Sequence, residues 1–249
     1  MPIIDLSIVT INYNNRDGLF RTCASLRALK QFEWVEHIIV DGGSSDGSVD
    51  ELPNFDQFHT TIISEPDRGI YDAMNKGIRR SRGNFVWMLN SGDEFSGACE
   101  KLKTYIKVIS AQKLDVALFA SWLRDPGELG GDIIHCPTIR KMSFMMSVIH
   151  QSVLVKKEAH RKMGLYSLKY RLASDYDLVS RFSKTRKLKV SLSNFPISIF
   201  CMGGLTDKNY IQSRRESAHS SFRRFAFAGI WSLFIYTCVY IKRVTAVHG

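Results

Sequence analysis

The stretch from Phe85 to Phe95, FVWMLNSGDEF, ends an apolar run in a turn that carries two neighbouring carboxylates, Asp93 and Glu94. One acidic turn is ordinary, because Asn, Ser, Gly and Asp are common turn residues. Three earlier apolar runs end in the same way, however, and the polar residues that follow the four runs are Thr10, Asn12, Asn14, Asp41, Glu65, Asp67, Asn90 and Asp93. Oxygen-bearing side chains of this kind can hold a hard divalent cation.

The elements that must position these groups alternate over the first half of the chain. Apolar runs typical of buried strands occupy 4–14, 37–43, 60–66, 84–90 and 115–123, and helical spacing of apolar residues occupies 16–31, 68–83 and 98–112. This alternation predicts βαβ units and a parallel sheet with helices on both faces. Ligands bind beyond the carboxyl ends of the strands in such sheets, so four polar strand ends predict a binding site at one edge.

Two common nucleotide-binding motifs are missing from the sequence. A dinucleotide fingerprint needs GxGxxG directly after the first strand, where this chain reads NYNNRDG, and the P-loop pattern GxxxxGK[ST] is absent as well. The phosphates of a bound nucleotide would therefore be neutralised in another way. A divalent metal held by a carboxylate would serve.

Seven stretches, taken together and in order, resemble the inverting GT-A glycosyltransferases of family 2 over about residues 4–205. They are SIVTINYNN, IIVDGGSSDGS, EPDRGIYDAMNKGI, FVWMLNSGDEF, HQSVLVKK, SDYDLVSRF and MGGLT. The likeness extends to bacterial enzymes that build extracellular polysaccharide, such as the colanic acid glycosyltransferases. It implies an α/β GT-A fold, with a Rossmann-like, mixed but mostly parallel sheet flanked by helices. It also implies sugar transfer from a nucleotide-diphosphate donor to a saccharide acceptor in surface polysaccharide biosynthesis.

Carried over residue by residue, the resemblance implies a set of donor-binding positions. The set is Thr10, Asn12, Asp41, Arg68, Asn75 and Asn90. Thr10 and Asp41 match positions that hold the nucleotide base, and a carboxylate can accept a hydrogen bond from an N–H of uracil or guanine. Arg68 lies near the place of a nucleotide contact in the family. Asn75, inside the following helix, either contacts the donor or braces the neighbouring loop.

The resemblance also implies a metal site. The family motif at this place is commonly Asp-x-Asp or Asp-Asp, whereas NSGD keeps one carboxylate, Asp93, and has Asn90 and Gly92 where acids often stand. Asp93 would ligate Mg²⁺ or Mn²⁺, which bridges the donor phosphates and stabilises the leaving nucleoside diphosphate. With one protein charge, we expect weak metal affinity in the absence of donor. His150 could add a ligand or a phosphate contact, or be an ordinary packed residue.

The stretch ASDYDL supplies the candidate for proton transfer. An inverting transfer needs a base that deprotonates the acceptor hydroxyl as it attacks the anomeric carbon. Asp175 matches the family's base, although a carboxylate in the first turn of a helix is also favoured by the helix dipole. Asp177 lies two residues further on, would face elsewhere on a helix, and is the second candidate. Gly203 and Gly204 predict a loop that can move over the donor or acceptor.

Charge and cysteine content predict where the protein works. Residues 1–139 contain 14 basic and 19 acidic residues, and residues 140–249 contain 20 and 5. A basic bias confined to one part indicates a surface facing anionic lipid or a phosphate-bearing substrate rather than nucleic acid, or else solvated helix faces. Five scattered cysteines without CxxC spacing favour a reducing compartment and no zinc site. The first residues lack the basic region of a signal peptide, which favours a cytoplasmic protein.

The stretch 225–241 has 17 residues without a charge and is flanked by Arg223, Arg224, Lys242 and Arg243. A transmembrane helix needs ~20 apolar residues, with ~17 at the lower limit. Aromatic residues and basic flanks are typical of a helix that lies in the membrane interface. A true membrane span and a helix packed on the protein core are the alternatives.

These features divide the chain into three predicted parts. A nucleotide-sugar-binding half covers 1–135, an acceptor-binding half with the catalytic base covers 136–221, and a membrane-associating tail covers 222–249. We expect a glycosyltransferase at the inner face of the membrane, acting on a lipid-linked saccharide. Two other functions stay open. One is a sugar-phosphate nucleotidyltransferase, which would carry a Gly-rich basic loop where NYNNRDG stands. The other is a non-catalytic sugar- or lipid-binding relative, which would explain why the metal motif NSGD has only one carboxylate.

Overall fold

The computed structural model describes residues 3–29, 32–52, 60–125, 132–138, 148–185, 188–204 and 209–225. The helices are α1 (Arg16–Ser25), η1 (Leu26–Leu29), α3 (Ile70–Arg80), α4 (Cys99–Ala111), η3 (His150–Ser152), α5 (Lys157–Met163), α6 (Ser174–Lys184) and α8 (Tyr210–Phe225). The strands are β1 (Leu6–Asn12), β2 (Val35–Asp41), β3 (Thr60–Ser64), β4 (Phe85–Met88), β5 (Glu94–Phe95), β6 (Val116–Arg124), β7 (Ile133–His135), β8 (Val153–Lys156) and β9 (Val190–Cys201).

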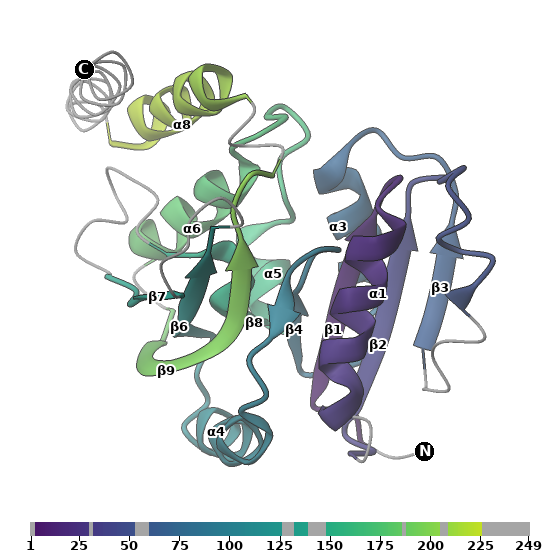
Figure 1. The fold of residues 1–249 in the computed structure, drawn as a ribbon. Helices are drawn as coiled ribbons and strands as arrows, with labels where there is room; N and C mark the ends of the chain where they lie inside the picture. The colour runs from purple at the N-terminus through teal and green to yellow at the C-terminus, as the bar shows by residue number, and fades with distance from the viewer. Residues whose placement is uncertain are drawn as a thin grey trace.

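Within these residues the strands form one nine-stranded sheet in the order β3-β2-β1-β4-β8-β6-β9-β5, with β7 paired to β6 (Figure 1). Strands β3, β2, β1 and β4 are parallel, as the alternation of apolar runs predicts. β8 lies antiparallel between β4 and β6. The strands predicted in the first half run in one direction, as expected, and the sheet is mixed because β8, a strand from the second half, enters its middle. The mixed, mostly parallel α/β sheet that the family resemblance implies is confirmed.

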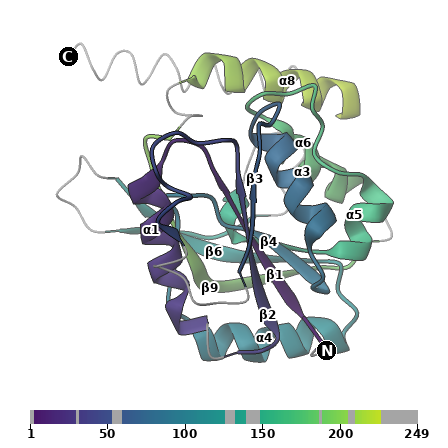
Figure 2. The ribbon, with the colours of Figure 1, turned by 90° about the vertical axis from the view of Figure 1, so that its right-hand side faces the viewer.

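Both faces of the sheet are covered by helices, because successive side chains of a strand point to opposite faces. Val9 and Ile11 of β1 pack with α3 and α6, whereas Leu6 and Ile8 pack with η1 and α4. α1 packs on the same face as α4, over Ile39 of β2. Figure 2 shows α3, α5 and α6 on one side of the sheet and α1 and α4 on the other.

Helix α3 lies close to β1, and this closeness depends on Gly77. A Cβ atom built on Gly77 would lie 2.3 Å from Cγ1 of Val9, which is far inside van der Waals contact. The amino end of α3 follows Gly69, whose φ of 110° is in the left-handed region that favours glycine. These two glycines fix the position of the first turn of α3, which carries Tyr71.

The apolar tail lies almost wholly outside the described residues. α8 ends at Phe225, so the helix predicted over 225–241 is not described beyond that residue. Among the helices that are described, none is both long and apolar enough to cross a membrane. The predicted boundary near residue 135 falls within one continuous sheet, since β8 and β9 from the second half pair with β4 and β6 from the first.

Candidate active site

The carboxyl ends of β1 and β2 meet in a hydrogen-bonded pair. Asn12 and Asp41 are aligned across the two strands, and Asn12 Nδ2 donates to Asp41 Oδ1 over 2.9 Å. The other carboxylate oxygen of Asp41 accepts the backbone N–H groups of Gly43 and Ser44 and the hydroxyl of Ser64, at 3.1, 2.9 and 2.8 Å. Burial alone would raise the pKa of Asp41, but the hydrogen bonds outweigh it, and its pKa is lowered. Asp41 is therefore ionised, and it organises the loop after β2.

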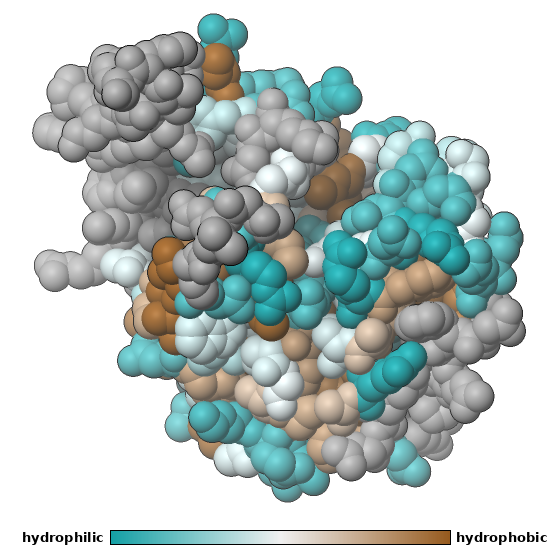
Figure 3. All heavy atoms as spheres, in the orientation of Figure 1, coloured by the Kyte–Doolittle hydropathy of each residue, from teal (hydrophilic) through white to brown (hydrophobic). Residues whose placement is uncertain are grey.

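Asn12 and Thr10 differ in what they offer a ligand. Asn12 Oδ1 is buried and lacks a hydrogen-bond partner among the described residues, so it can accept a bond from a ligand N–H. Thr10 is fully buried, and its hydroxyl lies 2.9 Å from Nε2 of His37. The structure brings Asn12 and Asp41 together at the edge and leaves Thr10 two residues inside it. Figure 3 shows hydrophilic residues over the surface above the ends of β1, β2 and β3.

Asp93 lies at the next strand end and is 5% exposed. Its two carboxylate oxygens accept one hydrogen bond each, from Nε2 of Gln151 at 2.8 Å and from the backbone N–H of Cys201 at 3.2 Å. Burial raises the pKa of Asp93 to about 7. The neighbouring Glu94 is bonded to Arg124 over 2.9 Å, so it has the structural role expected of it. Asp93 is thus a buried carboxylate with spare acceptor capacity.

The residues around Asp93 fit a metal that takes most of its ligands from a substrate. Asn90 Oδ1 is buried without a hydrogen-bond partner in the described part of the chain, three residues before Asp93. The described residues contain no group of three or more His, Cys, Asp or Glu side chains that could hold a metal alone. Mg²⁺ commonly binds through one or two carboxylates, with phosphates and waters completing its coordination. One carboxylate and one amide oxygen match that pattern.

Asp175 lies in the first turn of α6, where the sequence places it. Its Oδ1 accepts a 3.0 Å hydrogen bond from the Tyr71 hydroxyl and a 2.8 Å bond from the backbone N–H of Tyr176. Burial, and then the charge of Asp175, raises the pKa of Tyr71 well above its ordinary value. Tyr71 therefore stays protonated at physiological pH and acts as a donor that orients the carboxylate.

A layer of buried aromatic and amide groups supports this pair. Tyr71 stacks on Tyr166 with ring centroids 5.7 Å apart, and the Tyr166 hydroxyl lies 2.6 Å from His150 Nε2. Asn75 holds the backbone of Tyr166 at both N–H and C=O, over 2.9 and 3.0 Å. Of the two roles considered for Asn75, these contacts support the brace. His150 is buried and bonded to Tyr166, and burial lowers its pKa.

Two other predicted residues have specific partners. Asp177 is 3% exposed and bonds Ser220 of α8 at 2.9 Å and Arg181 at 3.2 Å, so it joins α6 to α8. Arg68 bonds Asp72 through Nε and Nη2, each at 3.2 Å, while most of its side chain stays exposed. Arg68 is therefore available at the surface, as a nucleotide contact requires.

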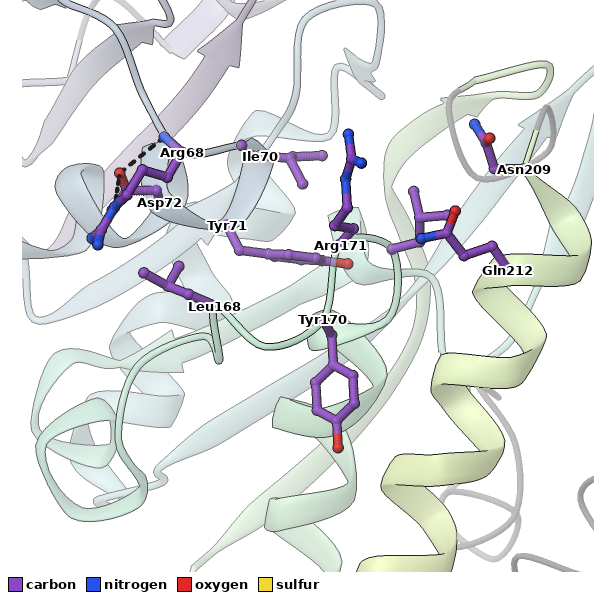
Figure 4. Close-up of a pocket in the computed structure, with 11 residues that line it drawn as sticks. Arg68, Ile70, Tyr71, Asp72, Leu168, Tyr170, Arg171, Asn209 and Gln212 are labelled. Carbon is purple, nitrogen blue, oxygen red and sulfur yellow. Dashed lines mark hydrogen bonds and ion pairs between the residues drawn. The ribbon is translucent and has the colours of Figure 1, made fainter.

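A cavity of about 370 Å³ opens beside Tyr71. Its wall is formed by the first turn of α3, the loop that precedes α6 and the start of α8 (Figure 4). Tyr71 both lines the cavity and donates to Asp175, so one residue links the cavity wall to the candidate base. The sequence patterns did not single out Tyr71, Gln151 or this cavity. Tyr71 has the same helical spacing as core residues such as Met74 and Ile78, and no local signal distinguishes it.

The sequence of this chain is similar to those of known glycosyltransferases. Residues 7–130 match the family described as glycosyl transferase family 2. An uncharacterised glycosyltransferase of Mycobacterium tuberculosis is 31% identical over 215 residues, which cover 85% of this chain and 78% of that protein.

Solved structures share the fold at low identity. The S. aureus protein TarS in complex with UDP-GlcNAc has a TM-score of 0.66 at 13% identity, covering 89% of this chain and 68% of that one. A mannosyltransferase from Pyrobaculum calidifontis, in complex with GDP-Man and Mn²⁺, has a TM-score of 0.60 at 12% identity and covers 99% and 76%. At such identities the likeness establishes the fold.

Proposed function

The chain belongs to glycosyl transferase family 2, and from that premise we propose that it transfers a sugar, with inversion, from a nucleoside diphosphate donor to a lipid-linked saccharide. The observation that carries the proposal is the Asp175 carboxylate, which Tyr71 orients beside a cavity. Tyr71 lies at the start of α3, the helix that follows the carboxyl end of β3. This position supports the proposal, because it connects the candidate base with the sheet edge at which we propose that the donor binds.

In the proposed reaction Asp175 acts as the general base. It accepts the proton of an acceptor hydroxyl while that oxygen forms a bond to the anomeric carbon. The bond between the anomeric carbon and the diphosphate oxygen breaks in the same displacement, and the nucleoside diphosphate leaves with the electron pair. Attack on the face opposite the leaving group inverts the anomeric configuration. The hydrogen bond from Tyr71 to Oδ1 keeps the carboxylate of Asp175 in a fixed orientation.

The donor would bind along the edge formed by the ends of β1, β2 and β4. Asn12 and Asp41 are the groups best placed to bond a nucleotide base, and Arg68 is the exposed cation for the nucleotide. Asp93 and Asn90 would hold Mg²⁺ or Mn²⁺. When bound, such a metal neutralises charge on the diphosphate. The UDP-GlcNAc and GDP-Man complexes of structural relatives, one of them with Mn²⁺, support a nucleoside diphosphate donor and a metal.

The proposal includes peripheral association with the cytoplasmic face of the membrane, for synthesis of a surface polysaccharide. Its support is the basic character of residues 140–249 and the apolar stretch 225–241. α8, which leads into that stretch, exposes Arg215 and Phe222. We expect removal of 226–249 to release the protein from membrane vesicles that contain anionic lipid. Unchanged sedimentation with vesicles after this deletion would refute the anchoring role.

The reaction is tested with purified protein, a panel of UDP- and GDP-sugars, Mn²⁺ and crude lipid-linked acceptor. We expect one donor to give nucleoside diphosphate and a product whose anomeric configuration, measured by NMR, is opposite to that of the donor. Asp175→Asn should lower turnover by at least about a hundredfold, since general-base catalysis typically contributes 10²–10⁴-fold. Release of pyrophosphate would indicate a nucleotidyltransferase instead. Retained configuration, or full activity of Asp175→Asn, would refute the proposed mechanism.

A further inference from the structure

The cavity beside Tyr71 adjoins the residue that bonds the candidate base. A general base has to lie within hydrogen-bond reach of the hydroxyl that it deprotonates. The Tyr71 hydroxyl bonds Asp175, and the same residue forms part of the cavity wall. A molecule that fills the cavity would therefore contact the residue whose hydroxyl bonds the base. The volume, about 370 Å³, is in the range of pockets that hold small ligands.

The wall of the cavity combines apolar and polar surface. Ile70, Leu168 and Leu172 contribute aliphatic side chains, and Leu168 is 44% exposed. Asn209 and Gln212 contribute amides from the start of α8, on the opposite side (Figure 4). Sugar rings present both C–H faces and hydroxyl groups, so this mixture suits a saccharide.

The charge of the cavity is unbalanced. Two arginines, Arg68 and Arg171, line it. Arg68 is compensated by Asp72, which accepts bonds from two of its guanidinium nitrogens. Arg171 is exposed, and within the described ranges it makes neither a hydrogen bond nor an ion pair. In Figure 4 its side chain extends past the hydroxyl end of Tyr71, into the space between Ile70 and Asn209.

An unpaired guanidinium in a cavity favours an anionic ligand. Its planar fork of N–H donors matches a carboxylate or a phosphate, and charge-assisted hydrogen bonds are about twice as strong as neutral ones. Among the described residues, Asp72 is the one acidic side chain that lines the cavity, and it is already bonded to Arg68. A bound anion would therefore meet a net positive wall.

We propose that this cavity is the acceptor subsite and that it selects an acceptor bearing an anionic group, carboxylate or phosphate, which Arg171 binds. The inference rests on the proposed function, because the position of Asp175 is what identifies the acceptor side. The anionic group has two chemical sources. It is either the carboxylate of a hexuronate in the saccharide or the phosphate that joins the saccharide to a lipid.

The test compares three classes of acceptor, each with the donor that the nucleotide-sugar panel identifies. They are neutral methyl hexosides, methyl hexuronides, and hexoses linked to a short prenyl chain through diphosphate. We expect the wild type to prefer one anionic class. Arg171→Gln should raise the KM for that class by on the order of tenfold and leave the KM for neutral hexosides unchanged, because only the charged contact is lost. Arg171→Lys should recover part of the loss, and preference for the hexuronide or the diphosphate identifies the source of the anion.

The matched control is Arg161→Gln. Arg161 is an exposed arginine of α5 that pairs with Glu158 and does not line the cavity, so the preference for an anionic acceptor should persist in this variant. An equal rise in the KM for neutral and anionic acceptors in Arg171→Gln would overturn the inference, as would transfer to neutral hexosides alone. Either result leaves the proposed function standing. Absence of transfer to every acceptor, by protein that binds the donor, would overturn both.

Discussion

The Tyr71 hydroxyl donates a 3.0 Å hydrogen bond to Oδ1 of Asp175, although the two residues are 104 positions apart in the sequence. Tyr71 is 5% exposed and belongs to α3, whereas Asp175 lies in the first turn of α6. The two helices pack on the same face of the sheet, so the bond joins the predicted donor-binding half of the chain to the predicted acceptor-binding half. We infer that Tyr71 is a positioning residue, because it acts on substrate through Asp175.

Tyr71→Phe should therefore reduce turnover without unfolding the protein. The ring can keep its stacking on Tyr166, and one hydrogen bond to a charged group is lost. Such a bond is worth about 1.5–3 kcal/mol, so kcat should fall roughly ten- to a hundredfold while the KM for donor stays constant. Steady-state kinetics with a saturating acceptor measures both quantities.

The control for this prediction is Tyr105→Phe. The Tyr105 hydroxyl bonds Ser191 over 3.1 Å, among aromatic residues that pack against α4 and away from the cavity. This variant loses a tyrosine hydroxyl bond of similar length and should retain its kcat. Equal turnover in the two variants, or a change in donor KM alone for Tyr71→Phe, would contradict the positioning role.

Asn75 should matter for stability more than for donor binding. Its side chain bonds both backbone polar groups of Tyr166, and Asn75→Ala would leave them buried without partners. We expect a loss of about 2–3 kcal/mol in the free energy of unfolding, with little change in donor KM. Urea unfolding measures the loss, and Asn84→Ala, which removes an exposed bond to Asp5, should cost much less. A large rise in donor KM would instead favour direct donor contact by Asn75.

The elements of the fold could be predicted from local pattern, but the order of strands could not. Alternation of apolar runs and helical spacing indicates β1 to β4 and the helices between them, because each pattern depends on residues close in sequence. The place of β8 depends on Val86 pairing with Val155, a contact between distant segments that neither segment's pattern encodes. β5 has only two residues and pairs with the distant β9, so local pattern does not indicate it either.

Some residues of the site could be predicted and others could not, again because contacts between distant segments leave no local pattern. Motif resemblance indicated Asp93 and Asp175, and both are partly or fully buried at the ends of elements. Thr10 was expected at the edge of the site, but the register of β1 with β2 sets Asn12, and not Thr10, opposite Asp41. Tyr71 gave no signal, because a buried tyrosine on an amphipathic helix has the pattern of a core residue.

Asp93 should make the metal-free protein less stable as pH rises. Its pKa is about 7 in the folded chain and near 3.8 in the unfolded chain, because burial disfavours the carboxylate. Between about pH 4 and 7 the unfolded chain therefore releases a proton that the folded chain retains, and the free energy of unfolding falls. The penalty is complete above pH 7 and amounts to at most about 4 kcal/mol. Urea unfolding in EDTA at several pH values measures it.

Asp93→Asn should remove this dependence and be more stable than the wild type at pH 8, but not at pH 4. Mn²⁺ with nucleoside diphosphate should raise the melting temperature of the wild type at pH 8. The rise should be much smaller at pH 5, because the carboxylate of Asp93 must be deprotonated to bind the metal. Glu94→Gln serves as the control and should keep the metal-dependent rise in melting temperature, since Glu94 bonds Arg124 and is not assigned to the metal. A metal-dependent shift of equal size in Asp93→Asn would rule out Asp93 as a ligand.

The close contact of α3 with the sheet should make Gly77 intolerant of any side chain. In Gly77→Ala the new Cβ would stand 2.3 Å from Cγ1 of Val9 in β1, so α3 has to move outward or Val9 has to change rotamer. Overpacking of this kind typically costs about 1–3 kcal/mol, and the outward shift would also carry Tyr71 away from Asp175. Gly204→Ala, which places its Cβ in open space, should change stability by less than about 0.5 kcal/mol. Equal unfolding midpoints in urea for the two variants would show that α3 can adjust without loss.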